Sequence, residues 1–285
     1  MPAANTRPAK PVPPGAVRVW RGYRLTTLSP QDFLSALGSI FIPASAQLQR
    51  LYGLTAYLPT VMPLGKPDSV PDEIALVFYE SQQAYNNTKL TVGGRAYSSL
   101  HSTVFALPRS ESGFPSLLGR TLQFDTPYHV FKKAVDWQLG FTQVFVGTRP
   151  DAITPQQFAA GLLRYLNALR EHCPSGLDGA VICATAACVL YWEHWTDENA
   201  SLRGRIADLP KLADRILLQA YTPTPIVIDL TAHYRGLTVT GGESFNIQFA
   251  RSGQATAAPD RPRRPSAKRT VKRQPSPRRR RPAKR

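Results

Sequence analysis

The sequence predicts an α+β protein made of two copies of one strand and helix unit, followed by a disordered, strongly basic tail. Three observations indicate this architecture. A segment near the N-terminus recurs in the middle of the chain, each copy has the pattern of a strand that runs into a capped helix, and the composition changes abruptly at Arg251. The chain has 285 residues, 42% of them hydrophobic, which is enough for a sizeable core.

The repeated segments are residues 19–33 and residues 144–158, which align without a gap. Identical residues stand at Val19 and Val144, Gly22 and Gly147, Arg24 and Arg149, Pro30 and Pro155, Gln31 and Gln156, and Phe33 and Phe158. In each copy a β-rich stretch comes first, over residues 17–25 and 142–148. The repeat therefore predicts two equivalent strands.

A helix is predicted directly behind each of these strands. Ser29 and Thr154 are the expected N-caps, and a proline occupies the first helical position in both copies. Asp32 and Gln157 are expected to close capping boxes. Apolar residues then recur at helical spacing: Phe33, Leu37, Ile40 and Phe41 in the first copy, and Phe158, Leu162, Leu166 and Leu169 in the second. Both helices should pack on a sheet.

The remaining elements follow in the same order in both copies. Two strands are expected after each helix, over residues 54–58 and 73–80 and over residues 180–184 and 188–193. The second of these strands ends on an aromatic pair and a glutamate, Phe78-Tyr79-Glu80 and Tyr191-Trp192-Glu193. A second helical region contains Gly94-Arg95 or Gly204-Arg205, and the last strands are predicted at residues 128–131 and 226–230.

This β-α-β-β-α-β order, given twice, is that of the ferredoxin-like split βαβ unit. The chain resembles the dimeric α+β barrel superfamily, in which two antiparallel sheets meet face to face, here as a fused pseudo-dimer. The predicted domains are an N-terminal segment (residues 1–16), two ferredoxin-like repeats (residues 17–135 and 136–250) and a polycationic tail (residues 251–285). The resemblance implies oxygenation, isomerisation or haem-dependent chemistry inside the barrel.

The tail carries most of the charge. Residues 251–285 contain 14 Lys and Arg and one acidic residue, Asp260, and so account for +13 of the net charge of +16. Such a segment cannot bury apolar surface, and its cations suit sequence-independent binding to phosphates. The expected nucleic-acid-binding residues are Arg263, Arg264, Lys268, Arg269, Lys272, Arg273, Arg278, Arg279, Arg280, Arg281, Lys284 and Arg285.

The tail resembles the basic tails of linker-histone-like proteins, in particular at Ser276-Pro277-Arg278-Arg279. That resemblance implies contact with the minor groove of DNA. A nuclear localisation signal, a solubilising tail, or an arm for RNA, polyphosphate or anionic lipid are the alternatives.

Within the body, candidate catalytic residues are few. His101 with Tyr97 one helical turn before it is the most attractive pair for proton transfer, although a lone helical histidine is more often structural. The charged residues that recur in both copies, Arg24/Arg149, Glu80/Glu193 and Arg95/Arg205, could line a cleft between the sheets or could simply stabilise strand ends.

The other candidates favour structural roles. His194, between Trp192 and Trp195, could form a pocket wall but is expected to pack into the core. Cys183 and Cys188 with His172 or His194 do not have the spacing of a metal knuckle, so no metal and no cofactor is expected. The sequence contains none of the common phosphate-loop, dinucleotide, nucleophile-elbow or zincin motifs.

Three functions remain open. The leading interpretation is a non-enzymatic protein that is tethered to DNA or RNA by its tail and binds itself or a protein partner through its body. An enzyme of the dimeric α+β barrel type, monooxygenase-like or isomerase-like, is the alternative. It requires an open pocket beside His101, Tyr97 or the Glu80/Glu193 pair, and a barrel filled by Phe and Leu side chains would count strongly against it. The third is a structural assembly protein with a nucleic-acid-binding arm. No stretch has the length and apolarity of a membrane span, so a cytoplasmic, nucleoid-associated or nuclear location is expected.

Overall fold

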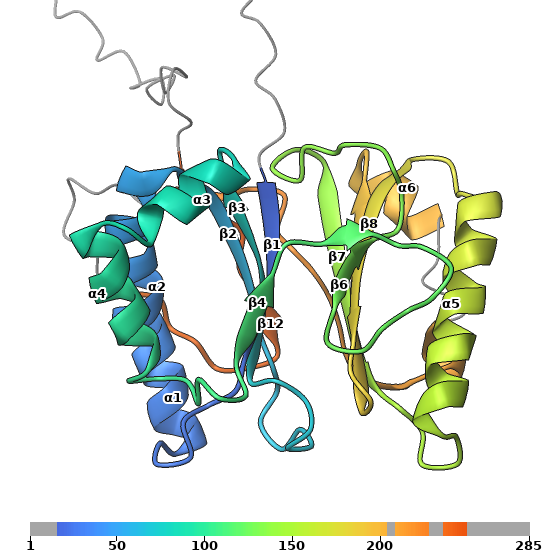
Figure 1. The fold of residues 1–285 in the computed structure, drawn as a ribbon, viewed down its shortest axis with the longest axis horizontal. Helices are drawn as coiled ribbons and strands as arrows, with labels where there is room; N and C mark the ends of the chain where they lie inside the picture. Colours follow the sequence, from blue (N-terminus) through green and yellow to red (C-terminus); the bar gives the residue numbers. More distant parts are fainter. Residues whose placement is uncertain (1–15, 204–208, 228–235, 250–285) are drawn as a thin grey trace, which may run out of the picture. The chain divides into compact units, whose positions relative to one another are not determined.

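The computed structural model describes residues 16–203, 209–227 and 236–249, which form an α+β body with two sheets. The two sheets face one another, and helices cover the outer face of each (Figure 1). In Figure 1 the first sheet and helices α1 to α4 are on the left, and the second sheet with α5 is on the right. The predicted fold class is thereby confirmed.

The first sheet is built on three long antiparallel strands. These are β1 (Ala16–Gly22), β2 (Leu54–Val61) and β3 (Glu73–Tyr79), which lie close to their predicted positions. The short strand β4 (Glu111–Gly113) adds to β1, and the described strands follow the order β11-β13-β2-β3-β1-β4. The order β4-β1-β3-β2 is that of a split βαβ unit.

The second sheet repeats this arrangement. Its long strands are β7 (Phe141–Thr148), β8 (Leu177–Ala184), β9 (Cys188–Trp195) and β10 (Asp214–Ala220), in the order β10-β7-β9-β8. We call β1 to β4 with their helices the first half of the body and β7 to β10 with theirs the second half.

The last strand predicted for each half belongs, in the structure, to the sheet of the other half. Residues 128–131 were expected to complete the first sheet, but β6 (Pro127–His129) pairs with β8 of the second sheet, beside β5 (Ser116–Leu117). Residues 226–230 were expected to complete the second sheet. Instead β11 (Ile226–Val227), β12 (Glu243–Ser244) and β13 (Ile247–Gln248) belong to the first sheet, where β12 and β13 pair with β2. Each sheet is therefore extended by short strands that follow the other half in the sequence: β5 and β6 extend the second sheet, and β11, β12 and β13 extend the first.

The helices differ between the halves. The first half has an irregular helical segment, which starts as α1 (Pro30–Ala36), continues through π-helical Leu37–Phe41, α2 (Ile42–Ala44) and π-helical Ser45–Gln49, and ends in the 3-10 turn Arg50–Tyr52. Its second helical region is α3 (Gln82–Thr88) and α4 (Val92–His101). The second half has the unbroken α5 (Pro155–Glu171), the short α6 (Glu198–Arg203) and the 3-10 turn Leu209–Lys211.

Apolar side chains fill the space between the two sheets. Leu58, Leu76 and Phe78 from the first sheet pack against Leu190 and Trp192 from the second, and all five are at most 3% exposed. Burial of such side chains is the main stabilising contribution to a face-to-face sheet packing. The centre of this layer is therefore a packed core of Leu, Phe and Trp side chains, which counts against a ligand site at the middle of the barrel.

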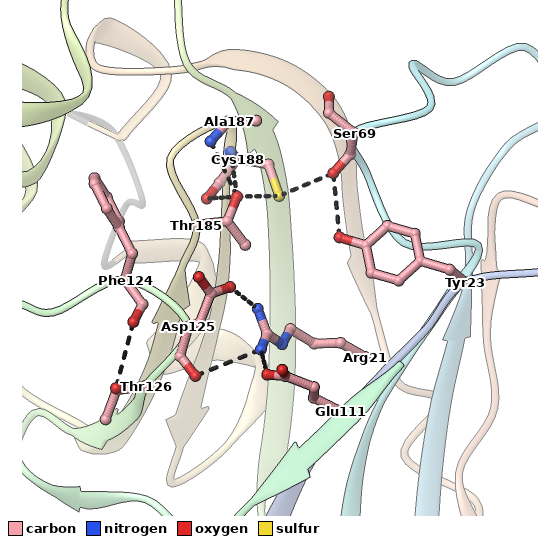
Figure 2. Close-up of polar contacts among 10 residues, drawn as sticks. All are labelled: Arg21, Tyr23, Ser69, Glu111, Phe124, Asp125, Thr126, Thr185, Ala187 and Cys188. Atoms are coloured by element: carbon pink, nitrogen blue, oxygen red, sulfur yellow. Dashed lines mark hydrogen bonds and ion pairs between the residues drawn. The ribbon is translucent and has the colours of Figure 1, made fainter. Parts of the chain in front are cut away.

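A polar cluster joins the halves at one edge of this core (Figure 2). The guanidinium of Arg21, which is 5% exposed, donates to Glu111 of β4 and to Asp125, 2.5 Å from its Oδ1. The backbone N–H of Asp125 in turn donates to the Ala184 carbonyl at the end of β8, at 2.7 Å. A buried charge with two carboxylate partners thus connects the first sheet to the second.

The strand register shows that Glu80 and Glu193, which were expected to be equivalent, do not occupy equivalent positions. Val19 pairs with Leu76 and Val144 pairs with Trp192, so Trp192 is the counterpart of Leu76 and Glu193 is the counterpart of Val77. The expected pairing of Glu80 with Glu193 is therefore wrong. Phe78-Tyr79-Glu80 and Tyr191-Trp192-Glu193 look alike in sequence but lie at different register positions on β3 and β9.

Both helix caps are present as predicted, and one capping box is complete. Ser29 accepts from the Asp32 N–H at 3.0 Å. Thr154 accepts from the Gln157 N–H at 3.2 Å, and the Gln157 side chain accepts from the Thr154 N–H at 2.8 Å. The reciprocal pair satisfies two backbone donors that the first turn of α5 would otherwise leave unpaired.

We predict that Thr154→Ala lowers the free energy of unfolding by about 1 kcal/mol, because the substitution removes the acceptor of this capping box. Urea unfolding followed by circular dichroism measures the change. Thr154→Ser keeps the hydroxyl and is the matched control, which should stay within about 0.5 kcal/mol of the wild type. Equal losses in both variants would show that the hydroxyl does not stabilise the helix.

Candidate active site

A cavity of about 450 Å³ lies between the outer face of the first sheet and the helices of the first half. Its walls come from β1, β2 and β3 on one side and from the irregular segment, α3 and α4 on the other. The volume is in the range of small-molecule sites. Two smaller cavities, of about 390 and 320 Å³, are both lined in part by Trp137.

The π-helical turns shape one wall of the cavity. Pro43 stands inside this helical segment and has no N–H to donate, and the hydroxyl of Ser45 donates to the Phe41 carbonyl at 2.9 Å. The wider π turns before and after α2 bring Phe41 and Gln49 into the wall. Such turns are frequent at functional sites, since they turn side chains away from the regular helical stripe.

The sheet side of the cavity is aromatic and rests on a buried carboxyl group. Trp20 and Tyr57 line the cavity, and both donate to Glu73, the first through Nε1 at 2.9 Å and the second through its hydroxyl. Glu73 is completely buried. Burial raises the pKa of the Glu73 carboxyl to about 7, against the opposing effect of the two hydrogen bonds. Glu73 thus fixes the orientation of both rings.

His101 lies at the end of α4, in a corner of aromatic rings. Its ring centroid is 5.2 Å from that of Trp20 and 4.9 Å from that of Phe41. Nδ1 lies 2.9 Å from the Tyr97 carbonyl oxygen one turn earlier, so Nδ1 carries the proton and donates to it. Burial lowers the pKa of the His101 imidazole, which is therefore neutral at pH 7.

Tyr97 stands beside His101 and is held by the irregular segment. The two ring centroids are 4.6 Å apart, and the Tyr97 hydroxyl lies 2.7 Å from the Ser45 hydroxyl. Burial raises the pKa of the Tyr97 phenol, so the group is neutral. The predicted pair of His101 and Tyr97 is therefore brought together, at an open pocket.

The other end of the cavity is cationic. Arg18, Lys89 and Arg95 line it, and none of the described residues that line it is acidic. Arg18 lies over the ring of Tyr85, 3.6 Å from its centroid. The cavity therefore combines an aromatic interior, a neutral imidazole and a positively charged side.

The other sequence candidates do not join this site. Glu80 is exposed and does not line the cavity. Glu193 is buried in the second half, where it accepts from Trp195 Nε1 at 3.1 Å, and burial raises the pKa of its carboxyl to about 7. Arg95 does line the cavity, whereas Arg205 lies outside the described residues.

Arg24 and Arg149 have the same structural role. Each guanidinium donates to the carbonyl of the residue before the helix N-cap, Leu28 in the first half and Ile153 in the second. The repeated arginine therefore fixes the turn between strand and helix. The structural interpretation of this pair is correct, and the expectation of a cleft-lining role is wrong.

His194 and the cysteines lie away from the cavity. His194 is 3% exposed and packs on Trp137, with Nε2 directed at the Leu139 carbonyl. Cys183 and Cys188 are buried in the layer between the sheets. In the described part of the chain, no group of three or more His, Cys, Asp and Glu residues could hold a metal ion.

The tail residues that were expected to bind nucleic acid, from Arg263 to Arg285, lie outside the described residues. The same holds for the segment that resembles linker-histone-like tails. No helix among the described residues has both the length and the apolarity needed to cross a bilayer.

Sequence reasoning missed five residues on which this account of the site depends: Arg18, Trp20, Gln49, Tyr57 and Glu73. A signal existed for three of them. Arg18 and Trp20 alternate on one face of a predicted strand that should be buried, and Glu73 begins a strand that is otherwise apolar. For Gln49 and Tyr57 we find no signal in the sequence alone.

Comparisons with known proteins give similarity only at the level of solved structures. No protein-family model matches the sequence, and no curated protein matches it. A provisionally assigned monooxygenase from Lactobacillus acidophilus NCFM is 9% identical, with 76% of this chain and 100% of the other covered and a TM-score of 0.34.

A provisionally assigned monooxygenase from Fusobacterium nucleatum subsp. nucleatum is 9% identical over 73% of this chain and 93% of the other, with a TM-score of 0.35. An anthrone oxidase-like protein is 8% identical over 72% of this chain and 93% of the other, with a TM-score of 0.29. At such identities and TM-scores the similarity transfers no activity and no residue role to this chain.

These findings correct the leading interpretation of the sequence, a non-enzymatic body tethered to nucleic acid. The body holds a cavity with the dimensions and lining of a small-molecule site. We therefore do not retain the non-enzymatic interpretation, and the enzyme alternative is taken up below as a proposal.

We predict that Glu73 makes stability fall as pH rises. Its folded-state pKa of about 7 lies above the ordinary value of 4.5, so the folded protein holds a proton that the unfolded chain releases between these pH values. We measure the free energy of unfolding of wild type and of Glu73→Gln by urea at pH 5 and at pH 8. The wild-type value minus the Glu73→Gln value should be lower at pH 8 than at pH 5, by on the order of 1–3 kcal/mol. A difference between the two proteins that does not change with pH would contradict a buried, protonated Glu73.

Proposed function

We propose that the body is an enzyme of the dimeric α+β barrel type, which acts on an aromatic small molecule in the first-half cavity with His101 as proton acceptor. One observation supports this most directly. His101 lines the cavity as a neutral imidazole, and its Nδ1–H is bound to the Tyr97 carbonyl. The lone pair of the ring is therefore on Nε2, and the hydrogen bond that the ring makes among the described residues uses Nδ1, not Nε2.

The surroundings of His101 suit removal of a proton from a weak carbon or oxygen acid. A neutral imidazole is the protonation state that accepts a proton, and a hydrogen bond from Nδ1 to a carbonyl stabilises the imidazolium that forms. Arg18 occupies the position on β1 two residues before Trp20, on the same face and about 7 Å away along the strand. A cation that lines the same cavity favours the negative charge that proton removal leaves on the substrate.

The same first step serves two reaction classes. Isomerisation needs only that the proton taken by His101 is returned to a different atom of the substrate, so no second reactant enters. Oxygenation needs molecular oxygen as a second reactant that takes electrons from the deprotonated substrate. We therefore state the function as proton abstraction from an aromatic substrate, which is the step the two reactions share.

One chain is sufficient for this site. The two sheets that pack face to face both belong to the described body, and the cavity is lined entirely by residues of the first half. A second copy of the chain is not needed to complete the cavity.

We predict that the protein accelerates exchange of the acidic C–H protons of 2-tetralone, an enolisable aromatic ketone, in D2O. Proton NMR measures the exchange rate. His101→Gln should lose about 100-fold or more of the acceleration, because it removes the proton acceptor. The acceleration should rise with pH through the lowered pKa of His101 and then level off, since only the neutral imidazole accepts a proton.

His172→Gln is the matched control, because His172 is an exposed histidine at the end of α5, far from the cavity in sequence and in the other half. This variant should retain the full acceleration. Exchange that the protein does not accelerate, or that proceeds equally fast in His101→Gln, would overturn the proposed function.

A further inference from the structure

Gln49, whose side chain lines the cavity, has a buried hydrogen-bond donor without a partner among the described residues. The side chain lines the cavity and is 2% exposed. Its Oε1 accepts from the Tyr79 hydroxyl at 3.1 Å, which fixes the orientation of the amide. Its Nε2 is buried and has no partner among the described residues. Because an unpaired buried donor costs free energy, this N–H group is suited to an acceptor that arrives with a ligand.

Arg18 presents a second unused donor at the same cavity. Its guanidinium packs over the rings of Tyr85 and Phe114, at 3.6 and 5.2 Å, and one Nη donates to the Ser112 hydroxyl. Its Nε is buried and unpartnered among the described residues. The two rings and the serine hold the guanidinium in one orientation, so this donor is fixed before a ligand binds.

The charge of Arg18 is also unbalanced. In the described part of the chain, no carboxylate lies within 4.0 Å of Arg18, whereas Arg21 three positions further on has two. Arg18 is partly buried, and this burial lowers the pKa of its guanidinium. Such a cation gains most from an anionic partner that forms charge-assisted hydrogen bonds.

We propose that the substrate of this cavity is an aromatic carboxylate, with its carboxylate bound by Arg18 and Gln49 and its ring between Trp20 and Tyr57. A carboxylate offers two acceptor oxygens, one for each unused donor, and balances the charge of Arg18. The aromatic walls accept the flat ring. This inference builds on the proposed function, because it names the substrate class of the same cavity.

A pair of probes with the same shape and different charge tests the carboxylate. Isothermal titration calorimetry of the full chain compares 2-naphthoate with 2-naphthamide, in which an uncharged amide replaces the carboxylate. We expect naphthoate to bind at least about tenfold more tightly, as the loss of a charge-assisted hydrogen bond implies. Equal affinities, or tighter binding of the amide, would overturn the inference, and this comparison needs no variant to fold.

A variant of Gln49 tests whether its side chain binds the carboxylate. Gln49→Glu has nearly the same shape but replaces the donor by a negative charge, so it should weaken naphthoate by about 10- to 100-fold. Naphthamide should bind this variant within about threefold of wild type, because its N–H can donate to the new carboxylate. Naphthoate binding that Gln49→Glu leaves unchanged would overturn the assignment.

Arg18→Gln should also weaken naphthoate by about tenfold or more. Its matched control is Arg109→Gln, because Arg109 packs over Tyr23 at 4.2 Å, also in the first half, but does not line the cavity. The control should bind both probes as wild type does. A similar loss in both arginine variants would show that the charge of the protein, and not this site, attracts naphthoate.

His101→Gln separates this inference from the proposed function. The substitution should abolish proton exchange but leave the preference for naphthoate over naphthamide, because the two donors proposed for the carboxylate belong to Arg18 and Gln49. If the preference persists without any proton exchange in wild type, only the proposed function fails. If proton exchange depends on His101 but naphthoate and naphthamide bind equally, only the carboxylate subsite fails.

Discussion

The layer of apolar side chains between the two sheets is the constraint on which the rest of the structure depends. Side chains from both halves are buried there, and the polar groups that enter the layer are satisfied within it, as when the Tyr221 hydroxyl lies 2.7 Å from Thr60 and accepts from Trp192 at 3.2 Å. The side chains at the centre of this layer are packed, and the cavities that include residues of the layer, beside Trp137, are the two smaller ones. The largest of the three cavities described above lies on the outer face of the first sheet, beneath its helices.

The two halves have the same strand order but have diverged in their helices. In the second half α5 is unbroken, and Phe158, Leu162 and Leu166 are buried against the sheet. In the first half the corresponding helix widens into π turns around Pro43, which carry Phe41 and Gln49 to the cavity. The contrast explains why a cavity of about 450 Å³ lies under the helices of the first half, whereas α5 packs directly on its sheet.

The strand register adds a detail to this division. Val77 is part of the cavity wall, and its counterpart Glu193 is a buried carboxyl in the second half that accepts from Trp195. Glu73 of the first half likewise accepts from a tryptophan, Trp20, but this tryptophan lines the cavity. Each half thus contains one buried carboxyl that orients an indole ring, at different positions on the central strand.

Much of the fold could be predicted from local sequence, because caps and alternation are local signals. Ser29 and Thr154 cap their helices as expected, and the six long strands that were predicted lie close to their expected positions. The sequence could not predict that β6 pairs with the second sheet and β13 with the first. Strands of two or three residues have too little sequence pattern of their own, and their position depends on the strand with which they pair.

The candidate site was predictable in part for the same reason. His101 and Tyr97 are one helical turn apart, so their proximity follows from the helix alone. Gln49 reaches the cavity only because the segment before it is π-helical, and a regular helix would direct its side chain elsewhere. Nothing in the local pattern around Gln49 distinguishes it from a solvated glutamine.

A crystal structure of the protein with 2-naphthoate bound tests the central claim most directly, since it shows which side of the first sheet a ligand occupies. The account predicts the naphthalene ring between Trp20 and Tyr57, beside His101, with the carboxylate at Arg18 and Gln49 and the layer between the sheets unchanged. A naphthoate molecule bound between the two sheets, beside Trp137 or beneath α5 would contradict it.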